Sequence, residues 1–161
     1  MATVQEYAAI VANSLDWEQA HASLDNAIRN LPADLRGKRA DKLPHSIYEL
    51  LEHIRVANKD LLDFCANAKY AEKLKWPDDY WPKSPAPKND KQWDDCVADL
   101  RKDIATFKQW TVDNADKLTD KIPWGSGQTF LRTVLVSMDH TSHHCGQIID
   151  VRRLLGSWPP Q

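Results

Sequence analysis

Apolar positions recur at spacings of three and four residues along most of the chain, which is the periodicity of helices packed on one face. Leu24, Ile28 and Leu31 follow this spacing and predict a first helix over residues 16–31. Pro32 is expected to end it, because the residue before a proline avoids the α conformation. No segment shows sustained strand-like alternation, so the pattern predicts an all-α protein.

A second helix is predicted to begin after Pro44. Ser46 and Glu49 have the spacing of a capping box, in which both side chains bond free backbone N–H groups at a helix start. The buried face of this helix is expected to carry Ile47, Leu50, Leu51, Ile54, Leu61 and Cys65.

Two further helices are predicted over residues 90–114 and 129–155, the second ending at Gly156, a usual C-terminal stop. The connection over residues 67–89 is long for a compact domain and permits a crossover instead of a tight hairpin. Its part 76–87 holds four prolines and three aromatic residues, which predict a packed loop. Together these elements predict a four-helix bundle, as a single domain over residues 1–161.

Composition is ordinary for a soluble globular protein, with 42% hydrophobic and 27% charged residues. The net charge is −2 and no basic block stands out, which argues against a nucleic-acid partner. No window approaches about 18 uninterrupted apolar residues, so no membrane partner is expected. The start of the chain lacks the pattern of a signal peptide. Cys65, Cys96 and Cys145 form no CxxC pair, and we expect reduced thiols and a cytoplasmic protein.

Three of the six histidines lie close together in the last predicted helix. His140 and His144 are four residues apart, so they lie one turn apart on one helix face. At about 100° per residue, that face is the apolar one, shared with Val136, Ile148 and Val151. The pair is therefore expected to point into the bundle, where an unpaired imidazole is costly.

His53, at the edge of the apolar arc of the second helix, is the third candidate ligand. Facing helices of bundles commonly build metal sites from inward side chains. Three neutral imidazoles suit zinc, nickel, cobalt, iron or copper. Three protein ligands with one open position describe a catalytic site and not a closed structural one.

Other interpretations of these side chains stay open. Inward histidines also occur in metal-free cores, bonded to backbone or carboxylates. His143, Gln147 and Glu49 are candidates for an assisting role, although Glu49 also suits the capping box; no catalytic residue is assigned. Cys145 is expected in the core. The two remaining histidines, His21 and His45, are expected at the surface.

The segment Ser-Ile-Tyr-Glu-Leu-Leu-Glu-His53-Ile and the later His140-Thr-Ser-His-His144-Cys-Gly-Gln-Ile resemble the DinB-like metalloprotein superfamily. Its members include bacillithiol transferases, a mycothiol-dependent maleylpyruvate isomerase and metal-dependent hydrolases. The resemblance implies that His53, His140 and His144 bind a divalent transition metal, commonly zinc or nickel. It also implies an up-down-down-up bundle, a homodimer, a small-molecule substrate and, in some members, a low-molecular-weight thiol. Family members often carry Arg where this chain has Cys145.

The sequence therefore favours a metal-dependent enzyme, either a hydrolase or a low-molecular-weight-thiol transferase. Substrate contacts are expected from the loop over residues 76–87 and from the region of Trp124. The alternative is a bundle that binds metal or a small ligand without turnover, modestly favoured because no carboxylate separates His140 from His144. A third interpretation is a structural protein with metal-free core histidines.

Overall fold

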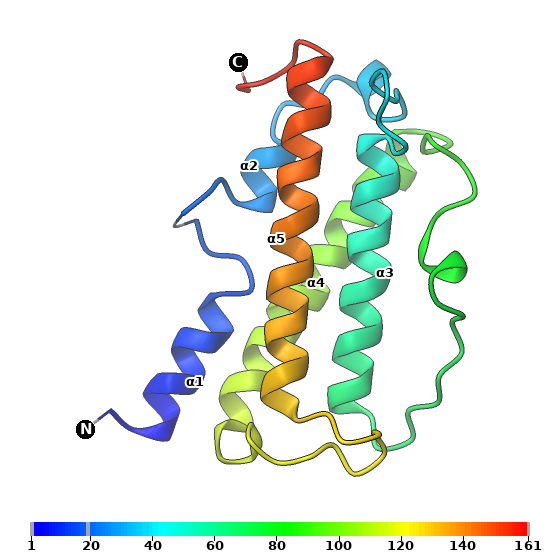
Figure 1. The fold of residues 1–161 in the computed structure, drawn as a ribbon. Coiled ribbons are helices and arrows are strands. Elements are labelled where there is room, and N and C mark those ends of the chain that lie inside the picture. Colours follow the sequence, from blue (N-terminus) through cyan, green and yellow to red (C-terminus); the bar gives the residue numbers. More distant parts are fainter. Residues whose placement is uncertain (1, 19, 161) are drawn as a thin grey trace.

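The computed structural model describes residues 2–18 and 20–160 and shows an all-helical protein. Within these ranges there is no β-strand, only an isolated antiparallel bridge between Lys121 and Thr129. The long helices lie side by side and two short helices pack against them (Figure 1). The long helices are α3 (Ile47–Ala66), α4 (Asp90–Asp113) and α5 (Phe130–Leu154). The short ones are α1 (Val4–Asn13) and α2 (Leu24–Ile28), and single 3-10 turns occur at Ala33–Leu35, Asp78–Tyr80 and Ala115–Lys117.

The helix predicted over residues 16–31 is wrong. Residue 19 lies outside the described residues, and of the rest only Leu24–Ile28 is α-helical. Ser23 has an extended backbone, and its side chain accepts a hydrogen bond from the Asn26 N–H. It is therefore the N-cap of α2, and a helix cannot run continuously through it. The first helix lies earlier, in α1, where Thr3 and Glu6 form a capping box of the kind recognised before the second predicted helix.

The three long helices begin and end within a residue or two of the predicted positions. The capping box of α3 is present, since Ser46 Oγ accepts from the Glu49 N–H at 3.1 Å and the Ser46 N–H donates to the Glu49 carboxylate at 2.7 Å. Asn89 and Thr129 cap α4 and α5 in the same way, each through its side-chain oxygen. Gly156, just beyond α5, has the positive φ of 71° expected at a helix end.

Helices α3 and α4 run in the same direction and α5 runs against them, with the connection over residues 67–89 returning along the outside of α3 (Figure 1). Helix α3 packs against both α4 and α5. The apolar stripes of the three helices meet between them, and burial of this surface is the main stabilising contribution. The most deeply buried members include Leu51, Ile54, Leu100, Phe107, Val134 and Ile148.

A buried polar bridge joins α3 to α5 within this core. The Asn58 amide nitrogen donates to Thr141 Oγ1 and to the Ile54 carbonyl, both at 3.0 Å, and its amide oxygen accepts from Ser137 Oγ at 2.5 Å. All three bridging side chains are at most 7% exposed. Because buried polar groups are costly without partners, this bridge favours one register of α5 against α3.

No helix within the described ranges combines the length and apolar character needed to cross a lipid bilayer. The expected thiols are present, since Cys65, Cys96 and Cys145 are all free and buried. Burial raises the pKa of Cys145 to about 11 and that of Cys65 to about 12, so these thiols are protonated at neutral pH. Cys145 therefore lies in the core, as predicted, and not among the candidate ligands.

Candidate metal centre

The fold brings together three histidines that are far apart in the sequence. One ring nitrogen from each of His53, His140 and His144 lies within 4.8 Å of the others. His53 comes from the middle of α3, and the other two come from successive turns of α5. His53 and His144 are 1% and 8% exposed, and His140 is half-buried. The cluster thus faces the interior between α3 and α5, as the helical wheels predicted.

The facing nitrogens have a spacing suited to one ion. His53 Nε2 and His140 Nε2 are 3.0 Å apart. A tetrahedral zinc ion with Zn–N bonds of about 2.0–2.1 Å holds two ligand nitrogens roughly 3.3 Å apart. Small side-chain adjustments would therefore place both nitrogens on a common ion.

His53 is held in one tautomer and one ring plane by the connection over residues 67–89. Its Nδ1 lies 3.0 Å from the Tyr80 carbonyl oxygen, which can only accept, so Nδ1 carries the proton and Nε2 the lone pair. The Trp81 indole stacks on the imidazole, with ring centroids 3.9 Å apart and an interplanar angle of 2°. A metal-binding histidine commonly donates its other N–H to a backbone carbonyl in this way.

His144 is oriented by Gln147, one turn further along α5. Its Nδ1 donates to Gln147 Oε1 at 2.7 Å, which leaves Nε2 with a free lone pair. The sequence indicated Gln147 as an assisting residue but placed it near His140. The structure pairs it with His144 instead, because the three-residue spacing brings that ring closer.

His140 is the one ring of the cluster with a buried, unpartnered nitrogen among the described residues. Since His53 Nε2 carries a lone pair, a hydrogen bond between the two rings requires the proton of His140 on Nε2. His140 Nδ1 is then a buried acceptor, and it has no partner among the described residues. A cation between the rings would instead receive the lone pairs of both Nε2 atoms. The His140 proton then lies on Nδ1, which has no partner among the described residues in either state. The convergence of three neutral imidazoles is the feature that fits a divalent transition metal.

The electrostatics keep the cluster neutral. Burial, together with a smaller contribution from neighbouring imidazoles, lowers the pKa of His140 to about 3 and that of His144 to about 4, from an ordinary value of 6.5. Burial also lowers the pKa of His53. Neutral imidazole is the form that binds metals, so the three rings keep their ligand lone pairs at neutral pH.

Sequence reasoning missed the role of His45. It stacks on Trp81 with ring centroids 3.9 Å apart and an interplanar angle of 12°, and it is half-buried instead of standing free at the surface. Its place could not be recognised, because Trp81 reaches it only through the fold of the connection. His21 is exposed, as predicted, and bonds Ser142.

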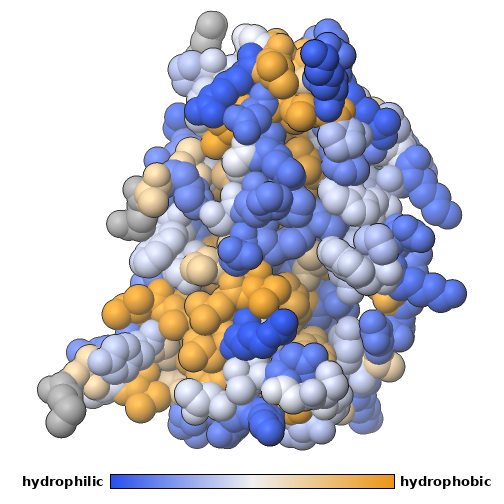
Figure 2. Space-filling view, viewed as in Figure 1, coloured by the Kyte–Doolittle hydropathy of each residue, from blue (hydrophilic) through white to orange (hydrophobic). Residues whose placement is uncertain are grey.

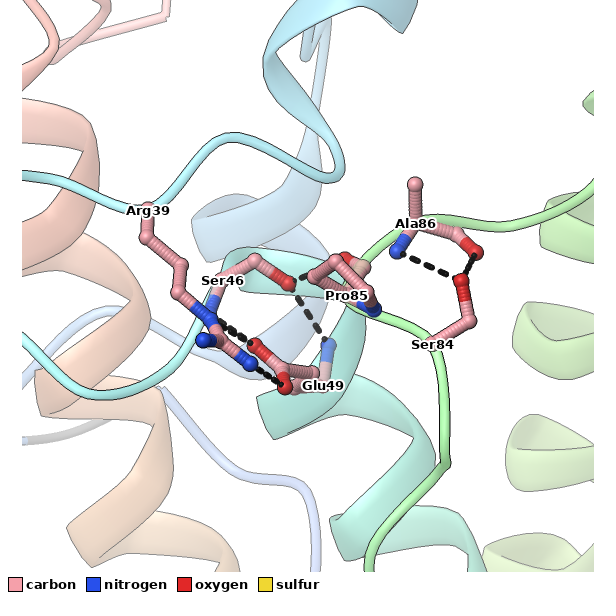
Figure 3. Close-up of polar contacts among 6 residues, drawn as sticks. All are labelled: Arg39, Ser46, Glu49, Ser84, Pro85 and Ala86. Carbon is pink, nitrogen blue, oxygen red and sulfur yellow. Dashed lines mark hydrogen bonds and ion pairs between the residues drawn. The ribbon is translucent and has the colours of Figure 1, made fainter.

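The Glu49 carboxylate is bonded to groups outside the histidine cluster. Its carboxylate accepts from the Ser46 N–H and pairs with Arg39, and Ser46 Oγ in turn donates to the Pro85 carbonyl (Figure 3). Of the contacts described for His53, none is to Glu49. Glu49 therefore stabilises the start of α3 and the adjacent connection.

The sequence also suggested His143 and the region of Trp124 as parts of the site, and only His143 lies beside the cluster. His143 is exposed, and its ring meets that of His144 at 4.9 Å in a T-shaped contact. Trp124 instead donates its indole N–H to the Phe64 carbonyl at 2.7 Å. Phe64 lies about three turns beyond His53 on α3, so the region of Trp124 does not line the cluster.

The model of the DinB superfamily matches residues 16–148, a range that includes all three clustered histidines. The comparisons with curated proteins and with solved structures gave no match.

Proposed function

The chain belongs to the DinB superfamily, and from this we propose that it is a metal-dependent enzyme with one divalent ion, zinc or nickel, on His53, His140 and His144. The observation that carries the proposal is the convergence of one ring nitrogen from each histidine within 4.8 Å. Three protein ligands leave an open position for a substrate. When bound, the ion supplies Lewis acidity that lowers the pKa of a coordinating thiol or water.

Transfer of a low-molecular-weight thiol to an electrophile is the reaction we favour. Hydrolysis at a helical zinc site commonly uses a glutamate as general base. In the described part of the chain, no carboxylate contacts the three rings. Glu49, the carboxylate that the sequence suggested for an assisting role, pairs with Arg39. A thiol held on an ion by the three histidines would have a lowered pKa and could release its proton to solvent, so this reaction would not depend on such a base. Hydrolysis is the second candidate, with His143 as the basic side chain beside His144.

Binding without turnover is the alternative from a different class. The lack of a carboxylate beside the rings supports it as well, since a storage or sensing site needs no general base. The two classes differ in whether a metal-loaded protein converts any thiol and electrophile pair.

We infer that α1 and α2 together take the place of one bundle helix. In support, α1 packs on α4 and α2 packs on α5. With α3, α4 and α5 this gives an up-down-down-up four-helix bundle and a single domain over residues 1–161. The first bundle helix then consists of two pieces, α1 ending at Asn13 and α2 beginning at Leu24.

We also propose a homodimer. Val4, Tyr7 and Ile10 of α1 are 61%, 60% and 56% exposed, whereas Ala8 and Ala12 of the same helix are buried. Figure 2 shows hydrophobic side chains gathered over α1 and the neighbouring half of α5. Exposed apolar surfaces of this kind commonly mark protein contacts. Sedimentation of the wild type as a dimer, and of an Ile10→Glu variant as a monomer, would support this; a monomeric wild type contradicts it.

We expect a small-molecule substrate and no nucleic-acid or membrane partner. The net charge of −2 without a basic block supports the first exclusion. The three free thiols support a reducing compartment, and we propose the cytoplasm.

The direct test is the metal content of untagged protein, measured by elemental mass spectrometry. We expect about one equivalent of zinc or nickel, lost in His140→Ala and kept in His143→Ala, a matched control next to the cluster. The loaded protein is then assayed with bacillithiol, mycothiol or cysteine and an electrophilic chloroarene, following chloride release. Metal binding without conversion supports the binding alternative, and no metal after reconstitution contradicts the proposal.

A further inference from the structure

A large indole stands exposed beside the histidine cluster. Trp76 is 66% exposed, although its ring centroid is only 6.2 Å from that of His53. It also meets Tyr80 in a T-shaped contact at 5.2 Å. Tryptophan gives a large apolar contact area with few rotatable bonds, and it is enriched where proteins bind ligands and partners.

The backbone that carries Trp76 is fixed to α3 on its C-terminal side. The Tyr80 hydroxyl donates to the Asp60 carboxylate at 2.7 Å, and the Tyr80 carbonyl accepts from His53 at 3.0 Å. The next residue, Trp81, stacks on His53. The exposed indole is therefore anchored close to the candidate ligands and does not sit on a free loop.

Of the two neighbouring indoles, only Trp76 has an unoccupied face. The rings of His45 and His53 both lie 3.9 Å from Trp81 at interplanar angles of 12° and 2°. Two rings at that distance cannot share one face, so Trp81 is filled on both sides. Trp76 has no parallel stacking partner within the described ranges, since its contacts with His53 and Tyr80 are at 44° and 67°.

No charged side chain among the described residues is hydrogen-bonded to the three rings. Outside the cluster itself, the described polar partners of His53 and His144 are the Tyr80 carbonyl and the Gln147 amide, and the remaining contacts are with aromatic rings. The face of an indole offers apolar area and no hydrogen-bond partner, so it favours a flat apolar group over a charged one.

We propose that Trp76 binds the planar aromatic or apolar body of the substrate by stacking, while a polar head on the same small molecule occupies the open metal position. This inference rests on the proposed metal site and adds the substrate class to it. The indole then sets specificity between substrates that share the same head.

The test uses two probes with one head and different bodies, benzohydroxamate and acetohydroxamate, titrated calorimetrically into zinc-loaded protein. We expect benzohydroxamate to bind more tightly than acetohydroxamate, with a preference that falls about fivefold in Trp76→Ala. Affinity for acetohydroxamate should stay unchanged in that variant, which shows that fold and metal are intact. Trp17→Ala is the control, because it removes a 42% exposed indole from a cavity on the other side of α5.

The outcomes separate the two proposals. An equal preference for benzohydroxamate in wild type and Trp76→Ala overturns the role of Trp76 and leaves the metal site standing. If neither hydroxamate shows zinc-dependent binding, the open metal position is wrong, and the inference about Trp76 fails with it.

Discussion

The Nδ1 atom of His53 donates to the backbone carbonyl of Tyr80 at 3.0 Å, across 27 residues of sequence. This bond makes the connection between α3 and α4 a part of the histidine cluster. Helix α3 supplies the position of the imidazole, but the connection selects its tautomer and, through Trp81, its plane. The long connection, predicted from sequence as a packed loop that contacts the substrate, therefore also orients a candidate ligand.

Replacing Trp81 by leucine should weaken metal binding about tenfold. Loss of the stack lets the His53 ring turn, and changes beside metal ligands typically cost 10–100-fold in affinity. Competition with a chromophoric chelator measures the effect, and Trp17→Leu is the matched control. Unchanged affinity in Trp81→Leu would show that the Tyr80 carbonyl alone is enough to hold the ring.

Zinc or nickel should raise the thermal midpoint of the protein. An ion that binds only the folded state adds about 2.7 kcal/mol at a free concentration of 100 times the Kd, which corresponds to roughly 5–10 °C for a chain of this size. Calorimetry with metal and with chelator measures the shift. We expect it to vanish in His140→Ala and to persist in His143→Ala; an equal shift in both variants would place the ion elsewhere.

The metal-free protein should lose stability as the pH falls from about 6.5 towards 4. Burial holds the pKa of His140 near 3 and that of His144 near 4, while both rings take up protons near pH 6.5 once unfolded. The unfolded state then binds more protons in this window, so the free energy of unfolding decreases with decreasing pH. Urea unfolding in chelator between pH 7.5 and 5 measures the slope. A His140→Leu, His144→Leu double variant should show a flatter dependence, and an equal slope would contradict the assignment.

Replacing Asn58 by alanine should destabilise the protein by about 2–3 kcal/mol. The change leaves Ser137 and Thr141 buried without this partner, and buried unsatisfied polar groups carry that order of cost. Urea denaturation of Asn58→Ala, Ser137→Ala and the double variant gives the coupling free energy. We expect coupling above about 0.5 kcal/mol; additive effects would mean that the bridge contributes no mutual stabilisation.

The parts of the fold that sequence predicted were those governed by local rules. Capping residues and helical spacing located α3, α4 and α5, and the wheel of α5 placed His140 and His144 inside. The prediction of the first helix was wrong because the buried residues of α1, Ala8 and Ala12, are small and give a weak apolar signal. Three apolar residues with the right spacing further on were mistaken for it.

The candidate site was likewise predicted only where local rules apply. Its three histidines followed from spacing and resemblance, whereas the groups that orient them did not. The carbonyl of Tyr80 has no side-chain signature, and the contact of His45 with Trp81 depends on how the connection folds back. Gln147 was recognised, but the ring it serves depends on side-chain direction and not on wheel position alone.

The 87 residues that separate His53 from His140 also bear on when the ion can enter. Helix α5 alone offers two imidazoles, and the third joins them only after α3 and α5 have docked. A nascent or partly folded chain therefore lacks the complete ligand set, so ion capture belongs to the end of folding and not to its beginning. Tight metal binding would consequently report that α3 and α5 have docked.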